Sequence, residues 1–212
     1  VGYGEKDVVM FAYGGGGDGK TAMSSLIKAI LGDSSIIGGA NIHVKGIKSP
    51  LQVKSISCGS ANMKPEVLTS PYAEKTSSHS EGGIIELHEK RFGNVAEPQK
   101  DRLKGRIVIR NDIIKQMAGG TGINVRRMYS GSVKCVINAT NMIELNEIPL
   151  FDDTSDGLVR RVVFVCFLTK FYAEEDKDKY SRARHKAVAN KRISGRIQTE
   201  QNIWEAGLRF FL

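Results

Sequence analysis

GGGGDGKT, which occupies positions Gly14 to Thr21, follows directly on the apolar run VVMFAY that ends at Tyr13. The stretch fits the pattern G-x-x-x-x-G-K-[ST], with a strand expected before it and a helix after it. Its glycines allow the backbone to curl so that successive N–H groups form a nest for phosphate oxygens. Lys20 then reaches the terminal phosphates, and the Thr21 hydroxyl ligates Mg²⁺. The pattern therefore predicts a site for a nucleoside triphosphate, expected to be ATP with Mg²⁺.

The helix expected from Thr21 to about Leu31 strengthens this prediction, because its positive N-terminal end faces the same phosphates. A glycine-rich turn that only caps a helix is the alternative interpretation, and the preceding strand argues against it. The residues expected to contact the nucleotide are Gly14, Gly15, Gly16, Gly17, Asp18, Gly19, Lys20, Thr21 and Ala22.

The composition is typical of a globular domain that binds a polyanion. The 212 residues suffice for one domain with a sizeable core, and 41% of them are hydrophobic. The net charge of +8 favours nucleic acid over a membrane as the partner, and no apolar stretch approaches the roughly 18 residues of a membrane span. Cys58, Cys135 and Cys166 lack metal-ligand spacing. Reduced thiols and a cytoplasmic location (for a viral protein, the host cytoplasm or a viral replication site) are therefore expected.

Apolar runs and helical periodicity alternate along the chain, which predicts an α/β three-layer fold around a mainly parallel five-stranded sheet. The expected strands are Asp7–Tyr13, Asn41–Val44, Phe92–Ala96, Val133–Ala139 and Val162–Phe167. The expected helices are Thr21–Leu31, Gly83–Glu89, Asn111–Met117 and Thr199–Leu212. We expect a core at residues 1–170, then a basic connector and a C-terminal helix at 171–212, within a longer protein. The basic residues of positions 170–196 belong either to a solvated connector or to a nucleic-acid surface.

Hydrolysis of a bound nucleotide also needs an acid, a polarising group and positive charge, and each has a candidate next to an expected strand. Glu97 is expected to orient Mg²⁺ or activate water, with a plain solvent-facing residue as the alternative. Asn141 is expected at the end of its strand, where it holds the attacking water or touches the γ-phosphate; a loop-capping role is the alternative. Arg160 and Arg161 repel each other, which suggests an anion nearby, although a salt-bridged surface pair is the alternative.

In their linear order these elements resemble the superfamily 3 helicases, and most closely the helicase module of poxvirus-type primase-helicases of large DNA viruses and phages. The resemblance covers roughly residues 5 to 170 and rests on Ser78-His79, Lys90-Arg91, Ala96-Glu97, Ile114–Gly120, Val125–Tyr129, Ala139–Asn141 and Asp156–Arg161. It implies an AAA+-like P-loop NTPase fold and a ring, usually a hexamer. It also implies ATP-driven 3′ to 5′ translocation on single-stranded DNA, and a primase domain in the same polypeptide.

The resemblance also implies a role for each candidate residue. Lys20 and Thr21 become the Walker A pair, Glu97 the Walker B acid and second metal ligand, Asn141 the sensor, and Arg161, or else Arg160, an arginine finger acting on a neighbouring subunit. The chain departs from the pattern of these helicases at several places, among them a shorter segment between Tyr129 and the strand of the sensor. Asp18 replaces an Asn, Thr121 replaces an Asp, and Val95-Ala96 stands where a second acid often accompanies the Walker B Glu.

Positions 123–135 predict a β-hairpin that contacts nucleic acid. Ile123–Tyr129 alternates like a strand, Ser130–Ser132 has turn chemistry, and a second strand starts at Val133. The residues expected at or near the tip are Arg126, Arg127, Tyr129 and Lys134. Positive charge with a stacking ring suits single-stranded DNA without sequence preference, and the resemblance places such a hairpin in the channel of the ring. A plain surface hairpin is the alternative.

The leading interpretation is thus an ATP-dependent replicative DNA helicase domain. A P-loop ATPase that remodels or packages without unwinding, and a non-catalytic nucleic-acid-binding module, are the alternatives. Strand displacement separates the first interpretation from the second, and ATP turnover stimulated by single-stranded DNA separates both from the third.

Overall fold

A computed structural model describes most of the regular structure expected from the sequence. The described residues are 7–31, 59–69, 84–88, 90–98, 100, 105–119, 122–126, 132–173, 175–176, 186–190, 192–200 and 202–203. The predicted strand Asn41–Val44 lies outside these ranges. No helix within them is long and apolar enough to cross a membrane.

Five parallel strands form the central sheet, in the order β2-β3-β7-β1-β9. Their bounds are β1 Val9–Tyr13, β2 Ser60–Asn62, β3 Phe92–Val95, β7 Thr140–Leu145 and β9 Val162–Cys166. The predicted parallel five-stranded sheet is thereby confirmed. Because all five strands run the same way, their carboxyl ends lie along one edge of the sheet. Within the sheet, β7 lies between β1 and β3.

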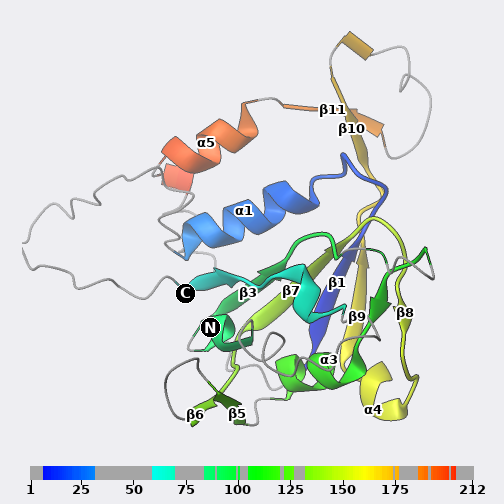
Figure 1. Cartoon of the computed structure of the whole chain (residues 1–212). Coiled ribbons are helices and arrows are strands. Elements are labelled where there is room, and N and C mark those ends of the chain that lie inside the picture. Colours follow the sequence, from blue (N-terminus) through cyan, green and yellow to red (C-terminus); the bar gives the residue numbers. More distant parts are fainter. Residues whose placement is uncertain are drawn as a thin grey trace, which may run out of the picture.

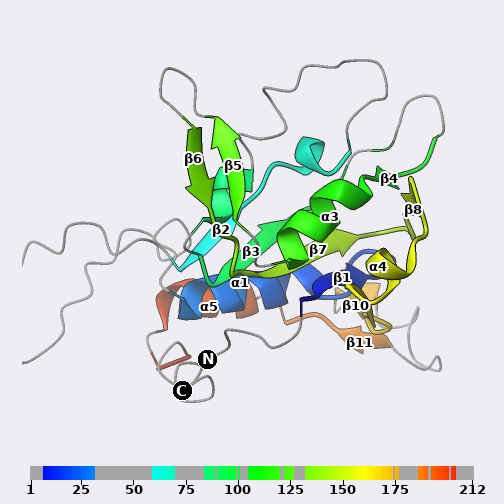
Figure 2. The same cartoon turned by 90° about the horizontal axis from the view of Figure 1, so that it is seen from below.

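Helices cover both faces of this sheet and complete three layers (Figures 1 and 2). On one face lies α1 (Lys20–Ile30), against which α5 (Ile193–Thr199) packs through Ile197 and Ala29. On the other lie α3 (Asn111–Ala118), the one-turn α4 (Asp156–Val159) and two 3₁₀ turns. The turns are η1 (Pro65–Val67) and η2 (Ile85–Leu87).

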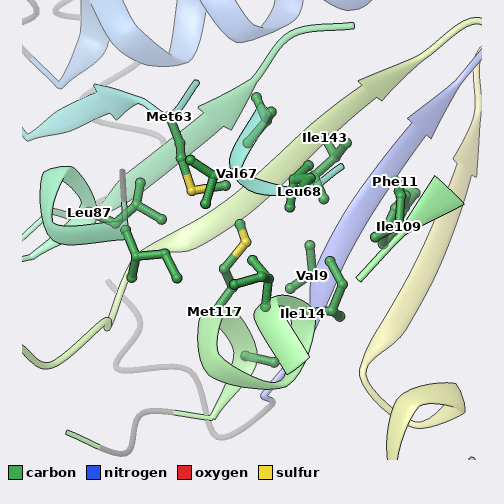
Figure 3. Packing of buried hydrophobic residues seen from close by; sticks show 14 of the residues in the cluster. Val9, Phe11, Met63, Val67, Leu68, Leu87, Ile109, Ile114, Met117 and Ile143 are labelled. Carbon is green, nitrogen blue, oxygen red and sulfur yellow. The ribbon is translucent and has the colours of Figure 1, made fainter. Parts of the chain in front are cut away.

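The main core fills the space between α3 and the sheet (Figure 3). Phe11 and Ile143 of the central strands are fully buried there with Ile114 of α3. Met117, one turn further along α3, is 2% exposed. Burying each such side chain contributes on the order of 1.5–3 kcal/mol, so this packing fixes the position of the sheet edge from which the functional loops leave.

Among the described residues, three small two-stranded sheets accompany the central one. β4 (Val108–Ile109) pairs with β8 (Leu150–Phe151), and β10 (Lys170–Tyr172) pairs with β11 (Lys186–Val188), both in parallel. β5 (Ile123–Arg126) and β6 (Ser132–Cys135) form an antiparallel hairpin, as predicted. Figures 1 and 2 both place this hairpin on the side of the sheet away from α1.

The strand predicted at Val133–Ala139 is wrong. Its first half belongs to β6 of the hairpin, and the strand that enters the central sheet is β7, which starts at Thr140. Asn141 and Glu144 interrupt the apolar pattern of β7, yet both are buried because they hydrogen-bond to other elements. A prediction from local hydrophobicity therefore placed the strand at Val133–Ala139, just before β7.

Two helix predictions also need correction. Gly83–Glu89 was expected to be α-helical, whereas the described part contains the 3₁₀ turn η2. The start of the C-terminal helix, expected at Thr199, is wrong, because α5 ends at that residue and Glu200 after it has extended backbone. Asn202 and Ile203, within the predicted range Thr199–Leu212, are helical. Residues 204–212 lie outside the described ranges.

Candidate phosphate-binding site

The loop between β1 and α1 has a backbone that requires glycine. Gly16, Gly17 and Gly19 have φ angles of 83°, 66° and 88°, in the left-handed region that other residues rarely adopt. The N–H of Gly14 donates to the carbonyl of Leu145 (3.1 Å), which fixes the start of the loop to the end of β7. α1 begins at Lys20 with no side-chain cap and no acidic residue in its first turn. The N–H of Lys20 donates to Oδ1 of Asp18 at 3.4 Å, so the carboxylate of Asp18 lies at the N-terminal end of α1, where the motif predicts a phosphate.

Lys20 binds oxygens of its own loop. Its ammonium donates to the carbonyl of Gly14 at 3.0 Å and to Oδ2 of Asp18 at 2.5 Å, and only 4% of the residue is exposed. Burial raises the pKa of Asp18, but hydrogen bonds and the charge of Lys20 outweigh it, so this pKa lies below its ordinary value. Asp18 therefore competes for the ammonium with any phosphate.

Strand β10 holds the loop from the other side. The N–H of Phe171 donates to the carbonyl of Gly17 at 2.8 Å. A Cβ placed on Gly19 would lie 3.4 Å from the Phe171 ring. The loop is therefore confined between the end of β7 and β10.

Glu97 and Asn146 meet at the same edge of the sheet. Glu97 follows β3 by two residues, and its carboxylate accepts a hydrogen bond from Nδ2 of Asn146 at 2.6 Å. Asn146 comes directly after β7, the strand next to β1. Among the described residues, Glu97 is the one non-glycine residue with positive φ (36°), a strained conformation of the kind that concentrates at functional sites. An acid and an amide thus lie together at the edge that carries the loop.

The predicted position of Asn141 is wrong. It pairs with Val9, the first residue of β1, so it lies near the amino ends of the strands, about 13 Å along the strand from the loop. It is fully buried, and Nδ2 donates to the carbonyls of Met117 (3.0 Å) and Ala139 (2.9 Å). Asn146, which was not predicted from the sequence, lies at the carboxyl end of β7 instead. Its position directly after the apolar residues that end at Leu145 could have indicated this location.

Glu144 on β7 is a second acid that was not predicted from the sequence. It is 2% exposed and hydrogen-bonds to Thr21 and Ser24 of α1. The three residues line a cleft of about 410 Å³ that continues along β2 and β3 beside the start of α1. Nothing local marks Glu144 as buried, because its partners come from a distant part of the chain.

The oxygen donors beside the loop fit a small divalent cation. Thr21 offers a hydroxyl, and Glu97 and Glu144 offer carboxylates from adjacent strands. The described residues contain no cluster of three or more His, Cys, Asp or Glu side chains. Mg²⁺ does not need one, since it uses one or two protein oxygens and takes its other ligands from phosphates and water.

Arg160 and Arg161 lie at the edge opposite the loop. The carbonyl of Arg161 accepts a hydrogen bond from the N–H of Val9 at the amino end of β1 (2.7 Å). Its guanidinium donates to the carbonyl of Gly157 at 2.5 Å, while Arg160 is exposed. Within one chain, neither arginine is brought near Lys20.

The hairpin expected to contact nucleic acid is described only at its base. Asn124 pairs with Lys134, whose side chain is exposed and lies against Gly122. Arg126 is the last residue of β5. Arg127 and Tyr129 lie outside the described residues, as does Thr121.

Comparison with known proteins gives a likeness of fold. No protein-family model and no curated protein matches the chain. Two solved apo structures of the C-terminal region of NrS-1, one of them described as residues 305–718 and the other as the A form, match it with a TM-score of 0.52 at 14% identity. The match covers 95% of this chain and 36% of each of theirs. At this identity the likeness concerns the arrangement of the elements and not their activity.

Proposed function

We propose that this chain is the P-loop ATPase domain of a ring-forming replicative DNA helicase of AAA+-like type. One observation carries the proposal: the glycine loop with Lys20, and the Glu97–Asn146 pair, lie at the same edge of a parallel sheet. In open α/β sheets, ligands bind at the carboxyl edge. A phosphate bound by the loop would face an acid that follows β3 and an amide that follows β7.

This arrangement supports hydrolysis of ATP by a water molecule. Glu97 orients the water and accepts its proton, and Asn146 positions the water or the γ-phosphate. Lys20 stabilises the charge on the terminal phosphate oxygens once it has exchanged Asp18 for phosphate. Mg²⁺, held by Thr21 and Glu97, would neutralise charge on the β- and γ-phosphates.

Action on single-stranded DNA is the second part of the proposal. The net charge of +8 and the hairpin with exposed Lys134 support a polyanionic partner. Ring assembly, expected to be hexameric, gives Arg160 and Arg161 a role at the next subunit's site, since they lie at the edge opposite their own loop. A primase domain elsewhere in the same polypeptide fits such a role in replication.

A non-catalytic nucleic-acid-binding module is the second candidate. The buried Asp18–Lys20 pair favours it, because it occupies the ammonium that a phosphate needs. A remodelling or packaging ATPase would use the same site and differs only in lacking strand displacement.

The test of the proposed site is Glu97→Gln. We expect nucleotide binding to persist and ATP turnover to fall about 10²–10⁴-fold, the usual size of a lost general base. The matched control is Glu86→Gln, an exposed glutamate of η2, which should keep the wild-type rate. Normal turnover by Glu97→Gln would remove this acid from the mechanism. Strand displacement by the wild-type protein then separates a helicase from the other motors.

A further inference from the structure

Glu144 is a buried carboxylate that the hydrolysis scheme does not use. It lies on β7 with 2% exposure and accepts three hydrogen bonds: from Thr21 Oγ1 at 2.9 Å, Ser24 Oγ at 2.7 Å and Asn94 Nδ2 at 3.1 Å. Burying a carboxylate is costly unless such donors compensate it. A glutamate on the central strand beside the phosphate loop therefore needs an explanation beyond packing.

The hydrogen bond that Thr21 donates to Glu144 fixes the orientation of the Thr21 hydroxyl. A threonine hydroxyl has a single proton and two acceptor lone pairs. The proton is directed at Oε2 of Glu144, so the lone pairs point elsewhere. A threonine held in this way presents its oxygen as an acceptor, which is the form a cation requires.

The residue that precedes Glu97 shows why a carboxylate at position 144 matters. Ala96, next to Glu97, lines the same cleft as Glu144 and carries no acid. β3 and β7 are adjacent and in register, with Val95 opposite Ile143, so Ala96 and Glu144 are the next positions along the two strands. The carboxylate absent from β3 is thus supplied by its neighbour β7.

Asn94 adds an independent sign that this wall of the cleft takes a ligand. It is 3% exposed and donates from Nδ2 to Glu144. Its Oδ1 is buried and has no hydrogen-bond partner in the part of the chain that the structure describes. Buried polar atoms are normally paired, and water molecules of a hydrated cation are suitable donors for this one.

We propose that Glu144 is a positioning residue for the divalent cation: it orients the Thr21 hydroxyl toward the metal and, with Asn94, accepts hydrogen bonds from the water shell of the metal. The inference rests on the proposed function, because it requires a metal-nucleotide complex at the loop. Mg²⁺ keeps several of its waters when bound. Residues that act in this way through a ligand usually change metal affinity about 10–100-fold.

The test compares Glu144→Gln with the wild-type protein in binding of a fluorescent ADP analogue. Without divalent cation, both should bind the analogue equally. When Mg²⁺ is added, the concentration that gives half of the gain in affinity should be about 10–100-fold higher for the variant. Ser24→Ala is the control, since it removes a donor to the same carboxylate but leaves the Thr21 contact. It should keep the wild-type Mg²⁺ requirement.

Each outcome decides between a metal-linked and a purely structural role. An unchanged Mg²⁺ requirement in a folded Glu144→Gln protein would overturn the inference while leaving the proposed function intact. Failure of the wild-type protein to bind the analogue in either condition would remove both. Should the Gln variant not fold, Glu144→Asp keeps the charge but withdraws it from Thr21, and the same rise is expected. Thr21→Val combined with either variant should give a non-additive effect if Glu144 acts through Thr21.

Discussion

Lys20 and Asp18 form an ion pair within a single loop, two residues apart, with both side chains 5% exposed. In such a site the charges are poorly screened by water, so each strongly determines what the other can bind. A phosphate that approaches Lys20 meets a carboxylate already hydrogen-bonded to it, and must displace that carboxylate against its own negative charge. Asp18, which stands where the helicases that the chain resembles usually carry Asn, is therefore expected to oppose nucleotide binding.

Asp18→Asn should tighten nucleotide binding. The change replaces an ion pair by a weaker hydrogen bond from the ammonium to a neutral amide, a difference of about 1 kcal/mol, or roughly five-fold in affinity. Titration with a fluorescent ADP analogue measures it, and Asp112→Asn, which breaks an exposed ion pair with Arg110, is the control. Unchanged or weaker binding by Asp18→Asn would show that Asp18 does not compete with phosphate.

Stability against pH provides a second readout for Asp18. Its pKa in the folded chain lies below the ordinary value of 3.8, so the ion pair stabilises the fold above that value. This contribution is lost as the pH falls through the folded-state pKa. The wild-type protein should lose stability more steeply than Asp18→Asn in acid melts, and parallel curves would contradict this.

Among the elements, β1, the loop and α1 were predicted from sequence to within two residues at each boundary. Their signals are local: an apolar run, glycines and a helical pattern. β7 was misplaced because its two buried polar residues, Asn141 and Glu144, hydrogen-bond to α3 and α1, which no local pattern reveals. The positive φ of Glu97 and its contact with Asn146 are likewise products of the assembled sheet. The glycine loop with Lys20 and Thr21 was thus predictable, whereas the contributions of Glu144 and Asn146 were not.

The β5–β6 hairpin should contribute to DNA binding and not to basal hydrolysis. Replacing Arg127 and Lys134 by Ala should weaken binding to single-stranded DNA and flatten its salt dependence by about 0.7 log units per lost phosphate contact. ATP turnover without DNA should stay near wild type, because the hairpin lies on the side of the sheet away from α1 (Figure 2). The same double-alanine change at Arg192 and Arg196, both exposed at α5, tests the alternative nucleic-acid surface at positions 170–196. An unchanged salt slope would exclude the hairpin from the DNA path.

At the scale of the whole molecule, the two edges of the sheet carry different groups. The carboxyl edge has Lys20, Glu97 and Asn146, and the amino edge has Arg160 and Arg161. A ring is built from one repeated contact between two different surfaces of each subunit. Such a contact can bring the amino edge of one subunit to the carboxyl edge of the next, which a single chain cannot do for itself.

The last prediction tests whether the catalytic site is shared between subunits. The variant that lacks the arginine finger, Arg160→Ala or Arg161→Ala, should be inactive alone, as should Lys20→Ala, since an arginine finger supplied in trans contributes about 10³–10⁵ in rate. Mixed assemblies contain interfaces that join an intact Lys20 loop to an intact arginine, and these should regain ATP turnover. Arg160→Ala and Arg161→Ala are mixed separately with Lys20→Ala, because Arg160 is exposed whereas Arg161 is bonded to its own Gly157.

The variant that is inactive alone and restored by mixing identifies the finger. Arg161 was expected from the resemblance, but its hydrogen bond to Gly157 gives it a structural role that Arg160 lacks, so Arg161→Ala alone should also lower the melting temperature. Full activity of both arginine variants alone, or no recovery in subunits shown to mix, would mean that hydrolysis is completed within one chain. In that case the positive charge opposite Lys20 would have to come from a residue other than these two.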